Sequence, residues 1–265
     1  MMLGLNPQSA STFETSRFVD FGEVSNERPK QLLLSNPPIP TTGPPLAFNK
    51  VYLGGAVLSP RSRQRGGARN RADRESVALT ARQIDNLLAA TAHARAVGLP
   101  FTRMITIHWQ SAGVPLARMV WATGRFVDLL RKGIARFGSR TTWLWVHESG
   151  RRKDGHCHLL AYVPAGYVKR LMKLQLRWLR SITGKPYVPG VIYSRPIGGL
   201  LGLETSNPAL HTANLEAAFG YMLKGVAPEA VGSFALQRLE PGGRVIGKRC
   251  ATSQNIGAKA RKAKG

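Results

Sequence analysis

The sequence is poor in acidic residues and in cysteine, and it has no long apolar run. Only 14 Asp and Glu stand against 38 Lys and Arg, which gives its 265 residues a formal net charge of +24. Two cysteines, Cys157 and Cys250, exclude a disulfide framework and a zinc-finger ligand set. No apolar stretch reaches the ~18 residues that would cross a membrane, and the opening residues lack the apolar centre of a secretory signal. We therefore expect a cytoplasmic protein that has no membrane partner.

The charge imbalance indicates the kind of partner, and a missing motif argues against one activity. An excess of basic residues on this scale indicates a polyanionic partner, and nucleic acid is the commonest polyanion. The phosphate-binding loop G-x-x-x-x-G-K-[ST] does not occur in the sequence, so no helicase activity is expected. Any strand unwinding would then need a separate protein.

Composition divides the chain into a central domain and two basic tails. Residues 1–74 are predicted to be a largely disordered basic arm, because "SNPPIPTTGPP" is rich in proline and "RSRQRGGARNR" is basic and of low complexity. A folded domain is predicted over residues 75–228, followed by a flexible basic extension over residues 229–265. The domain opens with a helix that begins at Thr80, where T-A-R-Q matches a capping box, and ends at Gly98.

Hydrophobic periodicity assigns the elements of this domain. Strands are predicted at 101–109, 141–148, 156–163 and 190–196, and helices at 116–138, 166–182 and 211–226. The order β-α-β-β-α-β, followed by a helix, is that of the ferredoxin-like, split βαβ arrangement. The predicted fold class is therefore α+β, with helices covering a sheet of mixed strand directions.

Two histidines in the strand "HCHLLAYV" point to the same face of the sheet. His156 and His158 are two residues apart, and side chains alternate along a strand. Alone, this spacing is more typical of two histidines on a half-exposed face. In the hairpin "VHESGRRKDGH", however, a turn centred near Arg152 places Glu148 opposite His156. Two imidazoles and a carboxylate with open positions suit a catalytic divalent ion better than structural zinc, which has four protein ligands.

His108 and Tyr221 are further candidates. His108 ends the first strand, which neighbours the histidine strand in this topology, so it is an additional or substitute ligand or a polar residue at a strand end. Tyr221 and Lys224 fall off the apolar stripe of the last helix and are neighbours on its surface. A tyrosine there is most often an amphipathic filler. With a metal to polarise a phosphate and a cation to hold developing charge, it could instead attack phosphorus.

Together these motifs resemble the HUH superfamily of single-strand DNA endonucleases, and in particular its single-tyrosine rolling-circle replication initiators. The triplet His156-Cys157-His158 resembles the HUH motif, and "YMLK", from Tyr221 to Lys224, resembles the YxxK motif. "FTRMITIHW" resembles the apolar first motif, and Glu148 matches the position of the third metal ligand. The resemblance covers roughly residues 100–226. The tails do not match the family, and His108 leaves the identity of the third ligand open.

The resemblance implies a reaction. A divalent ion, Mn²⁺ or Mg²⁺, would be held by His156, His158 and Glu148, and Tyr221 would be the nucleophile, supported by Lys224. Cleavage would give a 5′-phosphotyrosine and a 3′-OH that primes rolling-circle replication of a plasmid or phage. The implied partners are single-stranded DNA at a replication origin and a separate host helicase and polymerase. A conjugative relaxase or a transposase would use the same chemistry, and a non-catalytic basic DNA- or RNA-binding protein is a further alternative.

Basic side chains of two helices and of the C-terminal extension are expected to bind DNA. These are Arg125, Lys169, Lys173, Arg177, Arg180, Lys248 and Arg249. Trp109, Trp143 and Trp145 are alternative platforms for base stacking, although tryptophans are more often core residues.

Overall fold

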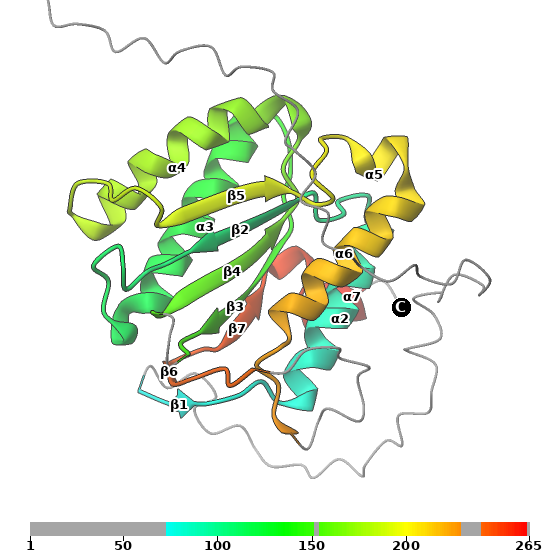
Figure 1. Ribbon diagram of the computed structural model, residues 1–265. Helices are drawn as coiled ribbons and strands as arrows, with labels where there is room; N and C mark the ends of the chain where they lie inside the picture. The colour runs from blue at the N-terminus through cyan, green and yellow to red at the C-terminus, as the bar shows by residue number, and fades with distance from the viewer. Residues whose placement is uncertain (1–72, 151–153, 229–239, 264–265) are drawn as a thin grey trace, which may run out of the picture. The chain divides into compact units, whose positions relative to one another are not determined.

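The computed structural model describes residues 73–150, 154–228 and 240–263 (Figure 1). All of these residues belong to one of the two compact units of the chain, Phe48–Gly265. The predicted basic arm therefore lies almost wholly outside the described residues, and so do residues 229–239 of the predicted extension. None of the described helices combines the length and the apolar character needed to cross a bilayer.

Five strands form one sheet, and every pairing in it is antiparallel. Across the sheet they are β5 (Ile192–Pro196), β2 (Arg103–Ile107), β4 (His156–Ala161), β3 (Trp143–Glu148) and β7 (Cys250–Thr252). The four predicted strands are thus present. The expectation of mixed strand directions is wrong, because each strand runs opposite to its neighbours. The described residues form an α+β fold around this antiparallel sheet.

Four main helices cover the two faces of the sheet (Figure 1). They are α2 (Ala81–Ala96), α3 (Met119–Arg136), α4 (Val168–Thr183) and α6 (Pro208–Met222). Shorter pieces complete the described chain: α5 (Leu203–Ser206), α7 (Ala258–Lys262), and the 3₁₀ turns η1 (Leu116–Arg118), η2 (Ala165–Tyr167) and η4 (Gln254–Ile256). The start predicted for α2 is confirmed, since Thr80 and Gln83 form a capping box.

The alternation of side chains along the strands separates two cores. Cys157 and Leu159 of β4 pack with α3 and α4, whereas Leu160 packs with α2 and α6. Each leucine or isoleucine fully buried in these cores stabilises the fold by about 1.5–3 kcal/mol. We call the first side the α3/α4 face and the second the α2/α6 face. Because side chains alternate along a strand, His156 and His158 point to the same face as Leu160. The histidine pair therefore lies on the α2/α6 face.

Part of the predicted C-terminal extension belongs to the fold. β6 (Val245–Ile246) pairs with β1 (Glu75–Ser76) in a separate two-stranded sheet, and β7 extends the main sheet beside β3. A basic composition suggested a flexible tail, but these residues bury Val245 and Ile256 and form backbone pairs with distant strands. Residues 240–263 are therefore packed against the domain.

Candidate metal centre

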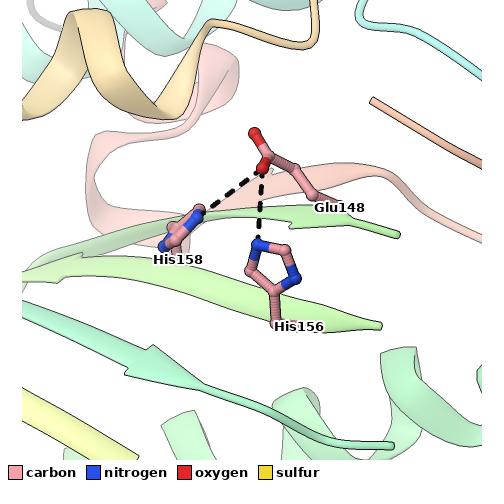
Figure 2. A group of neighbouring side chains, drawn as sticks. All are labelled: Glu148, His156 and His158. Carbon is pink, nitrogen blue, oxygen red and sulfur yellow. Dashed lines mark ion pairs between the residues drawn. The ribbon is translucent and has the colours of Figure 1, made fainter. Parts of the chain in front are cut away.

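The hairpin between β3 and β4 places Glu148 directly opposite His156. The register pairs these two residues, as the predicted turn centre near Arg152 requires, although residues 151–153 lie outside the described chain. His158 lies on the same face as His156, and Cys157 lies on the opposite face. Figure 2 shows both imidazoles turned toward one carboxylate oxygen of Glu148.

The three side chains are buried and their ligand atoms converge. Glu148 is 3% exposed and each histidine is 2% exposed. His156 Nε2 lies 3.4 Å from Glu148 Oε2, and His158 Nε2 lies 3.7 Å from the same oxygen. Among residues 73–150, 154–228 and 240–263 this is the one group of three such side chains that could hold a metal ion. Three ligands with a coordination position to spare are typical of a catalytic site.

Hydrogen bonds to the other ring nitrogens orient the two imidazoles. His156 Nδ1 donates to the backbone carbonyl of Asp154 at 2.7 Å, and His158 Nδ1 lies 2.9 Å from Thr106 Oγ1. Since a carbonyl oxygen can only accept, a neutral His156 presents the lone pair of Nε2 to Glu148. Two acceptors at this distance require a proton or a cation between them. Backing of Nδ1 in this way is the usual support of a metal-binding histidine.

The charges at the centre also suit a cation. Burial alone would raise the pKa of Glu148, but the contacts with His156, His158 and Lys224 outweigh it and hold that pKa below its usual range. Burial lowers the pKa of His158 despite the nearby carboxylate, which favours the neutral imidazole. Ligation needs an ionised carboxylate and neutral imidazoles. Glu148 Oε1 and His158 Nε2 are buried without a hydrogen-bond partner, an arrangement that costs about 1–3 kcal/mol per atom.

A glycine immediately before His156 fixes the start of β4. The backbone N–H of Gly155 donates to Gln110 Oε1, and a Cβ at this position would lie 2.6 Å from Met119 Sδ. A larger residue would require the ends of the Leu116, Met119 and Gln110 side chains to shift. The absence of a side chain at Gly155 therefore lets these three side chains pack close to the start of β4.

Tyr221 lies on the last turn of α6, beside the histidines. Its ring is edge-on to the ring of His158, with centroids 5.1 Å apart, and the side chain is half-buried. The structure thus brings together Glu148, His156, His158 and Tyr221, which the sequence places on three separate elements.

Lys224 reaches the centre in a way that differs from the prediction. The predicted helix over 211–226 instead ends at Met222, so Lys224 follows the helix and is only 2% exposed. Its Nζ lies 4.1 Å from the centroid of the Tyr221 ring, 3.2 Å from Glu148 Oε2 and 3.3 Å from Glu240 Oε2. Burial lowers the pKa of Lys224, but Glu148 and Tyr221 raise it by more, so the ammonium stays charged.

His108 lies next to the centre without joining the ligand group. It follows β2, and its ring stacks on His156 with centroids 5.3 Å apart and contacts Tyr193 edge-on at 5.9 Å. Its ring nitrogens are not part of the converging set. The geometry therefore favours Glu148 over His108 as the third ligand.

Sequence reasoning missed three residues that support the centre, namely Thr106, Asp154 and Glu240. The register of β2 with β4 pairs Thr106 with His158, and the alternation within "MITIH" could have identified this contact. Asp154 acts through its backbone carbonyl, and no side-chain pattern reveals that. Glu240 lies beyond the predicted domain boundary.

Most of the predicted DNA-binding cations are exposed, but they lie away from the metal centre. Arg125 is on α3, and the others are on α4: Lys169, Lys173, Arg177 and Arg180. Both helices cover the α3/α4 face, whereas the metal centre is on the α2/α6 face (Figure 1). Their side chains project from the outer side of these helices, so they would not line a strand bound at the histidines.

Arg249 does not fit its predicted role. It is 2% exposed, and its guanidinium donates to Ser76 Oγ at 3.0 Å and to the carbonyl oxygens of Ser76, Gly242 and Gly243. A guanidinium with its donors engaged inside the protein is not available to phosphate, so this residue joins β1 to the segment around β6. Its neighbour Lys248 is exposed.

Two of the three candidate tryptophans are core residues. Trp109 is fully buried and donates from Nε1 to Thr123 Oγ1 at 2.8 Å, and Trp145 is 3% exposed. Trp143 is half-buried. Only Trp143 of these three therefore keeps part of its ring accessible for stacking.

No family model matches the chain, and neither the curated proteins nor the solved structures give a significant match. The assignment of a function therefore depends on the geometry of the centre.

Proposed function

We propose that this protein nicks and rejoins single-stranded DNA, with Tyr221 as the nucleophile and Mn²⁺ or Mg²⁺ held by Glu148, His156 and His158. The observation that carries the proposal is the position of Tyr221. Its ring lies against that of His158 on one side and under the ammonium of Lys224 on the other. A phenol beside both a candidate metal site and a buried cation is suited to attack on a phosphodiester.

The order of the elements supports the same proposal. In chain order β2, α3, β3, β4, α4 and β5 follow the β-α-β-β-α-β pattern, and in space their strands lie in the order β5-β2-β4-β3. This order is compatible with the split βαβ fold that the proposal requires. It puts β4, which carries both histidines, at the centre of the sheet between β2 and β3.

In the proposed reaction the residues of the chain have separate tasks. Tyr221 Oη forms a bond to phosphorus while the bond from phosphorus to the 3′ oxygen breaks. The proton lost by the phenol is balanced by the proton that the 3′ oxygen gains. Lys224 keeps a positive charge beside the ring as negative charge develops, and the bound ion would act as a Lewis acid on the phosphate. Attack of the 3′-OH on the phosphotyrosine reverses the step and rejoins the strand.

We further propose that the nick starts rolling-circle replication of a plasmid or phage, with a separate helicase and polymerase. Transfer of a strand in conjugation or transposition would use the same residues, and the DNA target separates these roles. A DNA-binding protein without catalysis would be indifferent to the loss of the Tyr221 hydroxyl.

The test is the formation of a covalent adduct. Circular single-stranded DNA is incubated with the protein and Mn²⁺, and trapped adducts are mapped by peptide mass spectrometry. We expect DNA on Tyr221, and we expect Tyr221→Phe to bind DNA while forming no adduct. Tyr193→Phe is the matched control, because Tyr193 is 50% exposed on the same face of the sheet and should be dispensable. An adduct on Tyr193 would move the nucleophile, and the absence of any tyrosine adduct would refute the proposed function.

A further inference from the structure

Two hollows lie on either side of the edge strand β7. The first has a volume of about 930 Å³ and lies between α3, the segment that leads into β3, and β7. The second, of about 720 Å³, lies between β7 and the first turns of α2. Lys248, Ala251 and Thr252 line both. Figure 1 shows β7 at the edge of the sheet, beside β3. Both hollows therefore adjoin this edge, and together we call them the β7 groove.

The lining of the β7 groove is strongly basic. Its cationic residues are Arg74, Arg82, Arg131, Arg140, Lys248 and the buried Arg249. The one acidic residue among the lining residues is Asp128, which is paired with Arg131 at 3.0 Å and with Lys132 at 2.8 Å. Arg140 and Lys248 are both exposed. The net charge of the groove suits an anionic ligand.

An aromatic ring lies among these cations. Trp143 lines the first hollow and is half-buried, with the buried Trp145 two residues further along the same face of β3. A flat ring flanked by lysine and arginine is the combination that binds single strands, because bases stack on the ring while phosphates contact the cations.

The backbone that carries Lys248 is fixed in place. Arg249 is anchored to the carbonyl oxygens of Ser76, Gly242 and Gly243, and His147 Nδ1 lies 3.2 Å from the carbonyl oxygen of Lys248. The exposed ammonium therefore extends from a rigid strand edge rather than from a loose tail. A preorganised contact of this kind loses less entropy when a ligand binds.

We propose that the β7 groove binds a nucleic-acid strand, with a base on Trp143 and phosphates on Arg140 and Lys248. The first hollow is on the α3/α4 face and the metal centre is on the α2/α6 face, so this is a second site and does not depend on the proposed function. A strand held here would be retained whether or not Tyr221 reacts.

The test uses an oligothymidylate and the intrinsic fluorescence of tryptophan, in EDTA, with Tyr221→Phe as the parent protein so that no adduct can form. We expect the oligonucleotide to quench fluorescence and Trp143→Phe to remove most of that quenching. Trp121→Phe is the matched control, because Trp121 is 45% exposed on α3 but does not line the groove. Quenching lost equally in both variants, or in neither, would overturn the proposal. Phe preserves the apolar packing at both positions.

A second measurement examines the cations. Arg140→Gln with Lys248→Gln should weaken binding about tenfold and reduce the log–log salt slope by about 1.4, at roughly 0.7 per phosphate contact on a single strand. Lys173→Gln with Arg177→Gln removes the same charge from the outer side of α4 and should leave the slope nearly unchanged. Equal effects of the two pairs would show attraction by net charge alone and refute a defined groove. Equal quenching by an oligoglutamate of the same charge would identify an acidic peptide as the ligand instead.

Discussion

His147 and His158 lie on adjacent strands and are both buried, but they face opposite sides of the sheet and differ in their hydrogen-bond partners. On the α3/α4 face, His147 Nε2 lies 2.8 Å from Thr123 Oγ1 and its Nδ1 contacts the carbonyl oxygen of Lys248. On the α2/α6 face, His158 Nδ1 contacts Thr106, but its Nε2 has no hydrogen-bond partner. A saturated imidazole is part of the core, whereas an unsaturated one beside a buried carboxylate indicates a ligand site.

The strongest test of this contrast replaces each of the two histidines with alanine in turn. His158→Ala should abolish metal-dependent cleavage, because it removes a ligand. It should lower the free energy of unfolding by less than His147→Ala does, because the unsatisfied Nε2 is removed together with the single contact to Thr106. His147→Ala should lower that free energy by about 2–4 kcal/mol, since it leaves a cavity and removes the contacts with Thr123 Oγ1 and with the carbonyl oxygen of Lys248. Cleavage assays and urea denaturation of both variants decide the outcome. A His158→Ala protein that still cleaves DNA at the wild-type rate would contradict the ligand assignment.

A smaller effect is expected from the residue that orients His158. Thr106→Val keeps the shape of the side chain but removes the hydroxyl that contacts Nδ1 at 2.9 Å. Loss of such a supporting contact typically costs 10–100-fold in metal affinity. Titration of the variant with Mn²⁺, followed by calorimetry, should show a weaker site with unchanged stoichiometry. Thr123→Val, which removes the corresponding contact of His147, should leave Mn²⁺ affinity unaltered and lower stability instead.

The smallest effect should come from His108. Its ring stacks on His156 but is not among the converging ligands, so His108→Ala should reduce cleavage by a few-fold at most. The same calorimetric titration should give Mn²⁺ affinity close to that of the wild type. A loss in His108→Ala that exceeds the loss in Glu148→Ala would reverse the assignment of the third ligand.

The sequence predicted the centre well where strict local rules apply. Alternation along a strand puts His156 and His158 on one face, and the length of the hairpin loop sets Glu148 opposite His156. The same rules give the α+β class and the four central strands. Each of these inferences needs only neighbouring residues.

The rest could not be predicted, because it depends on contacts between distant segments. β7 is three residues long and is defined by its pairing with β3, about a hundred residues away in the sequence. Arginine and lysine are usually surface residues, so the sequence gives no sign that Arg249 and Lys224 are buried. Arg249 donates to the carbonyl oxygens of Gly242 and Gly243, and Lys224 is paired with the carboxylate of Glu240. A buried charge is recognisable only when its partners are known.

The ammonium of Lys224 has a consequence for the fold in the absence of a metal ion. Because this cation lies 3.2 Å from Glu148 Oε2, the buried carboxylate has a counter-ion within the chain even when no metal ion is bound. Small metal-dependent domains behave in the opposite way, since they unfold when chelated. We therefore expect the protein to stay folded in EDTA, whereas an ion that binds only the folded state should raise its melting temperature. Under the proposed function, binding of Mn²⁺ or Mg²⁺ can therefore follow folding.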